Sequence, residues 1–204
     1  MPAPPDGVGD LALPMEEADR IIPRVERLMM SKRFALQVAT QDWHPPGHVS
    51  FASSHPGCEP YDKVELYGRR ETVWPDHCVP GTPGAELYPG LPWDRVLLTV
   101  RCGSDPDFDC YSAFRSNPDV DGRRMPTGLA GFLKERWITD LYVCGIARDY
   151  CVRWTAMDGA DAGFRVWFVW DATRPVDPKS DEETRRLVES KGVKIVESPA
   201  LLKP

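Results

Sequence analysis

The pattern of apolar and polar positions predicts an alternation of strands and helices along the chain. Apolar runs without alternating polarity predict buried strands at 34–40, 95–101, 141–144, 164–170 and 193–196. Apolar residues at helical spacing predict helices at 16–30, 127–137, 149–162 and 181–191. Strands of this kind are buried on both faces, which is typical of a parallel sheet between two layers of helices. The sequence therefore predicts an α/β fold.

Two segments directly follow predicted strands and interrupt the regular pattern. Residues 41–92 form a long excursion rich in Pro and Gly, and residues 145–149 form a short turn before a helix. A compact domain seldom keeps so long an irregular segment unless the segment has a function. Open parallel sheets bind their ligands at the carboxyl ends of their strands, and both segments begin at such ends. We therefore expect the chemistry of the protein in these two segments.

The composition limits the classes of function. A length of 204 residues is typical of one domain with a sizeable core, so we expect residues 1–204 to form a single domain. The net charge of −6 argues against nucleic acid or an anionic membrane as a partner, because either would select a basic face. No apolar run reaches membrane-spanning length. The six cysteines lack zinc-finger or dense disulfide spacing, which indicates reduced thiols in a cytoplasmic compartment.

Cys151 is the candidate nucleophile, because of its position between two predicted elements. The strand at 141–144 ends before Gly145, and Asp149 is expected to cap the helix that follows. Cys151 then lies in the first helical turn, where backbone amides and the helix dipole favour a thiolate and later an oxyanion. The alternative is a small buried thiol that only packs between helix and sheet.

Asp42, His44 and His77 are candidate metal ligands. Asp42 and His44 are two residues apart directly after a strand, so in extended backbone their side chains point the same way. His77 lies in the same excursion and offers a third ligand. One carboxylate and two imidazoles suit Zn²⁺, Fe²⁺ or Mn²⁺ better than Ca²⁺. The alternative for each histidine is an ordinary loop residue.

Four motifs resemble those of nicotinamidases, in the isochorismatase-like cysteine hydrolase superfamily. They are QDWHPPGHVSFASSHPG, WPDHCVPGTPGAEL, DCYSAF and VCGIARDYCVRWTAMDGADAGF, and the resemblance extends from about Leu11 to Val196. It implies a three-layer α/β fold with a mostly parallel, six-stranded sheet. It also implies the hydrolysis of nicotinamide to nicotinate and ammonia through a cysteine thioester, as part of cytoplasmic NAD salvage.

The resemblance implies roles for the residues around the candidate nucleophile. Cys151 would attack the amide, and the backbone amides of Ala147 and Cys151 would form the oxyanion hole after an unusual cis peptide bond at Ile146–Ala147. Trp74 and Tyr111 would line the pocket for the flat pyridine ring of nicotinamide, the small-molecule partner.

The resemblance also implies a metal site. Asp42, His44 and His77 would hold a divalent metal, with Zn²⁺ favoured over Fe²⁺ and Mn²⁺, and the metal would hold the pyridine nitrogen. His48 is similar to a position that ligates the metal in only some members. The sequence leaves open whether the chain forms a homo-oligomer.

Two parts of the family's pattern are missing from this chain. The family's catalytic Asp lies on its first strand, at the centre of the sheet, and the chain starts with the loop that follows that strand. We expect that Met1 is an internal methionine, that a segment with this strand precedes it, and that the sheet has a gap at its middle. Cys102 occupies the position of the family's Lys, and Arg101 or Arg148 could supply a cation instead.

These departures leave two other functions open. The chain could be a catalytically impaired paralogue or truncated form that binds a metal and a small molecule. It could also be a related cysteine hydrolase that acts on another small amide. The charged run at 181–186 is expected to be a solvated helix face without a function.

Overall fold

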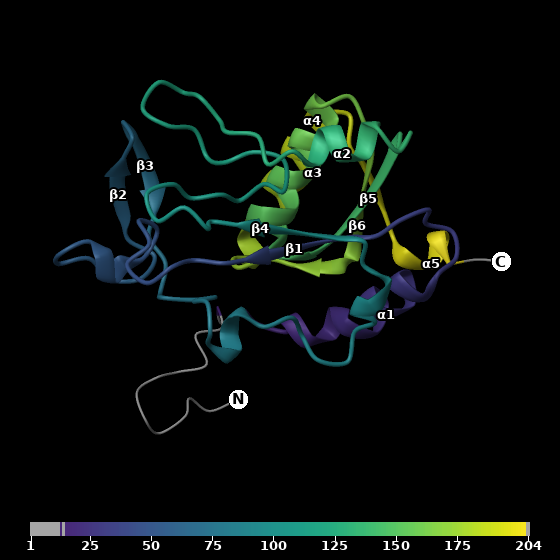
Figure 1. Cartoon of the computed structure of the whole chain (residues 1–204), viewed down its shortest axis with the longest axis horizontal. Helices are drawn as coiled ribbons and strands as arrows, with labels where there is room; N and C mark the ends of the chain where they lie inside the picture. The colour runs from purple at the N-terminus through teal and green to yellow at the C-terminus, as the bar shows by residue number, and fades with distance from the viewer. Residues whose placement is uncertain (1–12, 14, 203–204) are drawn as a thin grey trace.

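The computed structural model describes residues 13 and 15–202, so Met1 and the strand expected before it lie outside the described residues. The helices are α1 (Ile22–Met30), α2 (Leu129–Lys134), α3 (Arg153–Asp161), α4 (Asp181–Ser190) and α5 (Ser198–Leu201). The strands are β1 (Val38–Asp42), β2 (Lys63–Leu66), β3 (Arg69–Thr72), β4 (Leu98–Cys102), β5 (Asp140–Ile146), β6 (Arg165–Arg174) and β7 (Lys194–Val196). Figure 1 shows strands with helices on both sides, which confirms the predicted α/β class.

The boundaries of the predicted helices shift for local reasons. The first helix begins as a 3₁₀ turn, Ala18–Ile21, and becomes α1 where Pro23 occupies the first turn, a position that needs no amide hydrogen bond. The helix predicted at 149–162 is a π-helical turn, Arg148–Val152, followed by α3. The periodic pattern locates each helix, while its ends depend on such local features.

One regular element inside the long excursion was not predicted. β2 and β3 form an antiparallel hairpin, with Lys63 opposite Thr72 and Leu66 opposite Arg69. The two residues between the strands, Tyr67 and Gly68, both have positive φ, at 53° and 74°, as a type I′ turn requires. A Tyr-Gly pair is a weak signal for this turn, and the strands are too polar to stand out in the sequence.

The parallel strands form two hydrogen-bonded groups. β1 pairs with β4 in register from Val38–Leu98 to Asp42–Cys102, and β6 lies between β5 and β7 in the second group. Phe34, in the segment before β1, contacts Tyr142 of β5, with ring centroids 5.2 Å apart. The described residues thus contain five parallel strands, and among these residues no hydrogen-bonded strand pairing joins the two groups.

Helices cover both faces of the second group, and the apolar side chains of β6 divide between two clusters. Val166, Phe168 and Trp170 pack with residues of α2, α3 and α4, while Val169 and Ala172 pack with residues of α1 and α5. Phe168 is 0% exposed, and burial of such a side chain contributes about 1.5–3 kcal/mol to stability. This packing fixes β5 and the turn that follows it.

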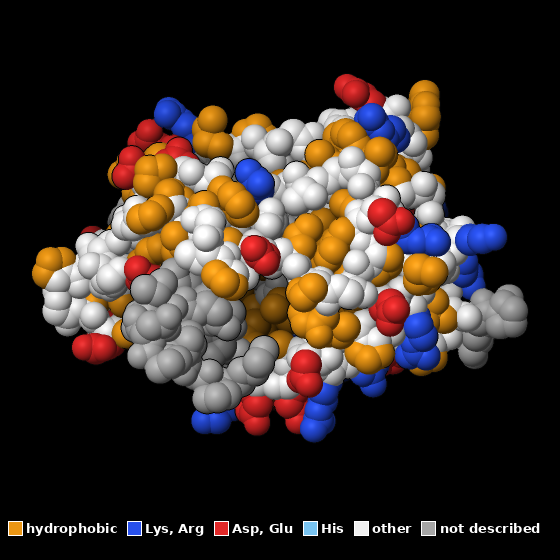
Figure 2. Space-filling model, turned by 60° about the horizontal axis from the view of Figure 1, so that its bottom comes forward, with side chains coloured by type: hydrophobic (Ala, Val, Ile, Leu, Met, Phe, Trp, Pro, Cys, Tyr) orange, Lys and Arg blue, Asp and Glu red, His pale blue; other side chains and the backbone are white. Residues whose placement is uncertain are grey.

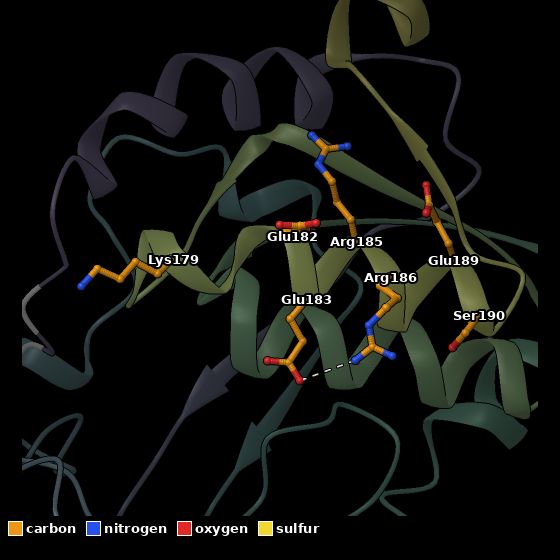
Figure 3. A pocket seen from close by; sticks show the side chains of 7 residues that line it. All are labelled: Lys179, Glu182, Glu183, Arg185, Arg186, Glu189 and Ser190. Atoms are coloured by element: carbon orange, nitrogen blue, oxygen red, sulfur yellow. Dashed lines mark ion pairs between the residues drawn. The ribbon is translucent and has the colours of Figure 1, made fainter.

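The surface of the described residues carries charges of both signs. On the face shown in Figure 2, acidic and basic side chains are interspersed. Charged side chains line a surface depression along α4, where Glu183 and Arg186 form an ion pair at 3.9 Å (Figure 3). Among the described residues, no helix is long and apolar enough to cross a membrane.

Candidate active site

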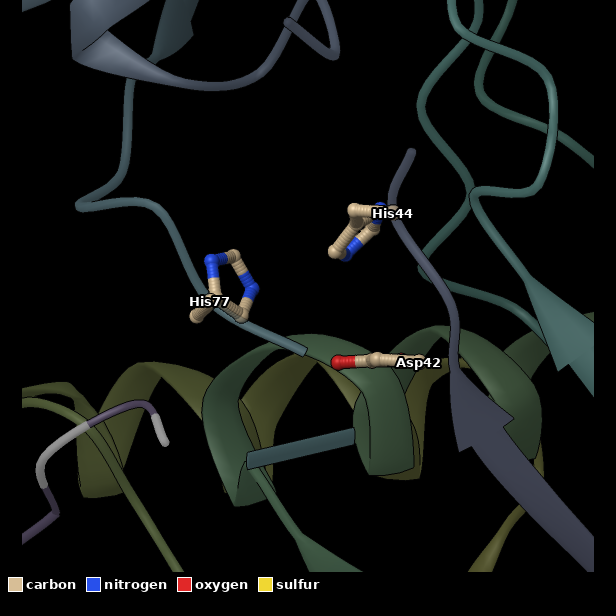
Figure 4. Close-up of side chains that lie close together, drawn as sticks. All are labelled: Asp42, His44 and His77. Atoms are coloured by element: carbon tan, nitrogen blue, oxygen red, sulfur yellow. The ribbon is translucent and has the colours of Figure 1, made fainter. Parts of the chain in front are cut away.

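Asp42, His44 and His77 come together at the carboxyl end of β1. Their candidate ligand atoms all lie within 4.8 Å of one another, and the three side chains point toward a common centre (Figure 4). Asp42 ends β1, so the two-residue spacing brings the side chain of His44 to the same place. The amide of His44 donates to the carbonyl of Cys78 at 3.1 Å, which fastens the segment of His77 to the end of the strand.

Both histidines are oriented to bind a metal through Nε2. Nδ1 of His44 lies 3.2 Å from the carbonyl oxygen of Gly103, and Nδ1 of His77 lies 2.8 Å from that of Pro75. Because a carbonyl oxygen only accepts hydrogen bonds, each Nδ1 carries the hydrogen and each Nε2 keeps a free lone pair. Backbone carbonyls commonly orient metal-binding histidines in this way. The donor set therefore fits a zinc ion with coordination positions left for water or substrate.

Burial keeps the two imidazoles neutral, which favours metal binding, but it disfavours the ionised form of the carboxylate. His44 is 3% exposed and His77 is 4% exposed. Burial lowers the pKa of His44 to about 4 and also lowers the pKa of His77, so both rings are neutral near pH 7. Burial raises the pKa of Asp42 to about 6, although His77 opposes this effect. A dication would favour the ionised form of Asp42 and would offset the cost of burying it.

His48 lies beside this group but is oriented differently. The Ser50 amide donates to Nδ1 of His48 at 3.2 Å, so Nδ1 holds a lone pair and Nε2 carries the hydrogen of the neutral ring. Nε2 then faces the carbonyl oxygen of Phe108 at 3.3 Å. His48 also forms a second cluster with His44 and Asp109, within 4.8 Å. The tautomer of His48 favours the ligand set Asp42, His44 and His77 over this second cluster.

Cys151 lies in the π-helical turn Arg148–Val152, directly after β5. The carbonyl of Ala147 accepts hydrogen bonds from the amides of Tyr150 at 3.2 Å and Val152 at 3.0 Å, which closes the turn around Cys151. The peptide bond between Ile146 and Ala147 is cis, which confirms that expectation. The turn has the expected place at the start of a helix.

The environment of the Cys151 thiol favours its protonated form. Burial raises the pKa of Cys151 well above its usual value, and the carboxylates of Asp42 and Asp109 raise it further. A hydrogen bond from the Ala147 backbone lowers it in part. Asp109 was not assigned a role from the sequence, although the DCYSAF motif contains it. A thiolate at Cys151 therefore requires added positive charge.

The two arginines considered as substitute cations point away from Cys151. The guanidinium of Arg101 stacks on the ring of Trp43 at 3.7 Å, as expected for a strand residue that faces the other side. Arg148 was expected to reach toward Cys151 or to be solvated, and both expectations are wrong. It is buried, and its Nη1 donates to both carboxylate oxygens of Asp181 on α4.

Cys102, at the position of the family's Lys, is a neutral buried thiol. It pairs in register with Asp42 across β1 and β4. A hydrogen bond with Cys110 raises the pKa of Cys102 well above its usual value, and burial and the charge of Asp42 add to this. Cys102 therefore supplies no charge to Cys151 near pH 7.

Aromatic rings form a wall beside Cys151. Nε1 of Trp74 donates to the hydroxyl oxygen of Tyr111 at 3.1 Å. Tyr150, next to Cys151, contacts both rings edge to face, with centroid distances of 4.7 Å to Trp74 and 5.4 Å to Tyr111. Tyr150 was not predicted from the sequence, and its place beside Cys151 was the only available signal. Flat walls of this kind suit a flat heteroaromatic ligand.

Asp149 does not cap the helix as predicted. It is 3% exposed, and its carboxylate accepts hydrogen bonds from the amides of Val176 at 2.9 Å and Asp177 at 3.0 Å. Its second oxygen also accepts from the hydroxyl of Ser180 at 3.1 Å. Asp149 therefore ties the turn of Cys151 to the segment that precedes α4.

Sequence comparisons relate the chain to known hydrolases. The isochorismatase domain family matches residues 9–198. The nicotinamidase of Acinetobacter baylyi is 45% identical over 160 residues, which are 78% of this chain and 72% of that protein. The nicotinamidase of Escherichia coli is 38% identical over 183 residues, which are 89% of this chain and 83% of that protein.

Solved structures give the same relationship. A nicotinamidase and pyrazinamidase of Acinetobacter baumanii superimposes with a TM-score of 0.85 and 41% identity, over 95% of this chain and 90% of that one. A zinc complex of the Pyrococcus horikoshii pyrazinamidase has a TM-score of 0.71 and 36% identity, over 91% and 89%. The yeast nicotinamidase bound to the inhibitor nicotinaldehyde has a TM-score of 0.80 and 26% identity, over 94% and 93%.

Proposed function

The chain belongs to the isochorismatase family and, within it, to the nicotinamidase-type amidohydrolases, and from this premise we propose that it converts nicotinamide and water to nicotinate and ammonia. The observation that carries the proposal is the convergence of Asp42, His44 and His77, within 4.8 Å, beside the turn that holds Cys151. The aromatic wall of Trp74 supports a flat pyridine substrate. In a cell, such a reaction would serve NAD salvage.

Cys151 is the proposed nucleophile. Its sulfur attacks the amide carbon, and the carbonyl oxygen becomes an oxyanion that the amides of Ala147 and Cys151 stabilise. The carbon–nitrogen bond then breaks, and the leaving nitrogen takes the proton that the Cys151 thiol gave up and departs as ammonia. Water attacks the resulting thioester, which releases nicotinate and restores the thiol. Trp74, Tyr111 and Tyr150 hold the ring while these steps occur at the carboxamide.

A divalent metal is proposed on Asp42, His44 and His77. Zn²⁺ is the first candidate, supported by the donor set and by the zinc complex of the related pyrazinamidase, with Fe²⁺ and Mn²⁺ as alternatives. When bound, it would supply positive charge near the Cys151 thiol and an acceptor for the pyridine nitrogen. The two histidines keep Nε2 free for it.

A second candidate function follows from the missing cation. Cys102 is neutral, and Arg101 and Arg148 point elsewhere, so a chain that keeps its pocket could bind nicotinamide without hydrolysing it. Such a chain would be a metal-dependent binding protein. A related reaction on another small amide, such as pyrazinamide, is the remaining alternative.

Ammonia release from nicotinamide tests the proposal. The zinc-loaded chain is assayed with Cys151→Ala as the blank, and pyrazinamide is assayed in parallel. Release above the blank with nicotinamide supports the proposed reaction. Binding of nicotinate by a folded, zinc-loaded chain that releases no ammonia from either amide would replace the enzyme with the binding protein.

We further propose a cytoplasmic location. All six cysteines are free thiols, which is the usual state in a reducing compartment.

A further inference from the structure

We propose that Arg148 is a positioning residue for the reaction, because its buried guanidinium fastens the turn that carries the amides of Ala147 and Cys151 to β6 and α4. This inference rests on the proposed function. The inference gives Arg148 a role other than that of the cation considered for the Cys151 thiol. Arg148 does not touch the reacting atoms.

All three guanidinium nitrogens of Arg148 are engaged. Nε donates to the hydroxyl of Thr173 at 2.8 Å, and Nη1 donates to both carboxylate oxygens of Asp181 at 2.8 Å and 2.6 Å. Nη2 donates to the carbonyl oxygens of Thr173 at 2.9 Å and Trp170 at 3.3 Å. Arg148 is only 5% exposed, so its bonds to Thr173 and Trp170 form away from competing water, whereas the side chain of Asp181 is 37% exposed. The planar fork therefore holds its partners in one geometry.

The partners of Arg148 lie on regular elements of the fold, β6 and α4. Thr173 is 0% exposed and pairs with Gly145, two residues before Ala147, in the β5–β6 register. The ring of Trp170 lies under the guanidinium of Arg148 at 4.1 Å, and Arg185 of α4 covers the same ring at 3.7 Å. The contact thus joins the turn to a strand and to a helix at once.

Asp149 reinforces the same attachment from the next position. Its carboxylate accepts two amides and one hydroxyl from the segment 176–180, so two consecutive buried side chains anchor the turn on its outer side. An oxyanion hole depends on donors held in place before the reaction, so looser anchoring should weaken the binding of the oxyanion more than the binding of the substrate.

The first test compares Arg148→Met, Arg148→Lys and Asp181→Asn. For Arg148→Met we expect kcat for nicotinamide to fall about tenfold or more, with KM and nicotinate affinity changed less than about twofold. Affinity for nicotinaldehyde, whose adduct with a thiol carries an oxyanion, should fall in proportion to kcat. Arg148→Lys should recover part of the loss, and Asp181→Asn, which leaves the acceptors on β6 intact, should lose least.

Arg124→Met is the matched control, because Arg124 also donates two hydrogen bonds to one carboxylate, that of the buried Asp158, at 2.6 Å and 2.7 Å. Arg124 lies outside the turn of Cys151, and its partner Asp158 lies near the far end of α3, the helix that follows that turn. We expect this variant to lose stability and to keep kcat per folded molecule. If Arg148→Met behaves in the same way, Arg148 is only structural and the proposal is overturned.

Hydrogen exchange of the amides at 145–153 tests the anchoring without any activity. Arg148→Met, or Arg148→Lys and Asp181→Asn if the first variant does not fold, should speed exchange in this segment relative to Arg124→Met. Equal exchange in both variants would overturn the proposal. If the unmodified chain releases no ammonia, the proposed function fails, while exchange and nicotinaldehyde affinity still decide the role of Arg148.

Discussion

Gly103 offers a direct way to disturb the candidate metal site without changing a ligand. Its backbone has a φ of +66°, and a Cβ added there would lie 2.2 Å from Cε1 and Nδ1 of His44. The carbonyl of the same residue accepts the hydrogen bond that fixes the His44 ring at 3.2 Å. Gly103→Ala should therefore displace His44 and leave Asp42 and His77 in place.

The size of the effect follows from the geometry. Ordinary contact begins at 3.4 Å, so the His44 ring or the Gly103 backbone would have to move by more than 1 Å. A zinc–nitrogen bond is about 2.0–2.1 Å long, so a shift of that size breaks it. Even the loss of a group that merely supports a ligand weakens metal binding by about 10–100-fold. We expect Gly103→Ala to bind zinc at least about 100-fold more weakly.

Competition with a chelator of known affinity measures the zinc dissociation constant. Gly122→Ala is the control, because Gly122 also has a positive φ, of +77°, but an added Cβ would meet nothing within 4 Å. Both variants carry a similar backbone cost of about 1–2 kcal/mol, and only Gly103→Ala carries the collision. Zinc affinity of Gly103→Ala equal to that of Gly122→Ala would refute the placement of His44 at the metal.

Three further predictions concern the same site. Asp42 must be ionised to bind a metal, and burial raises its pKa to about 6. Zinc affinity should therefore rise with pH up to about 6 and then level off. A rise in zinc affinity that levels off near pH 4 would contradict this. Burial raises the pKa of Cys151 well above its usual value. Cys151 in the metal-free chain should therefore react slowly with iodoacetamide at pH 7 and faster only at alkaline pH. A reaction rate that reaches half its maximum below about pH 8.5 would count against this prediction. Trp74→Ala should raise KM about tenfold or more by removing part of the aromatic wall. Trp74→Phe keeps a ring but loses the bond to Tyr111, so it should cost about 1 kcal/mol. Both effects are read from steady-state kinetics.

The elements of the fold were largely predictable because their signals are local. The apolar run at 141–144 falls inside β5, the run at 164–170 begins one residue before β6, and most of the apolar face of 16–30 falls on α1. The β2–β3 hairpin was missed because its strands are polar and its turn, Tyr67–Gly68, lacks the usual Asn or Asp. Strand pairing within a long excursion depends on contacts that the sequence does not display.

The candidate site was predictable where the spacing of residues along a strand alone determines the direction of their side chains. The two-residue step from Asp42 to His44 is such a case, and the structure places His77 beside them. The direction of Arg148 was not predictable, because it depends on Thr173 and Asp181, 25 and 33 residues further along the chain. The roles of these residues in a reaction stay predictions.

Turnover of nicotinamide by the zinc-loaded chain tests the central claim most directly. Ammonia is measured from the intact chain and from Cys151→Ala, after both are shown to be folded and to contain zinc. The account predicts ammonia and nicotinate in equal amounts from the intact chain alone. Equal background from both proteins, with zinc and nicotinate still bound, would contradict the claim that Cys151 is a working nucleophile.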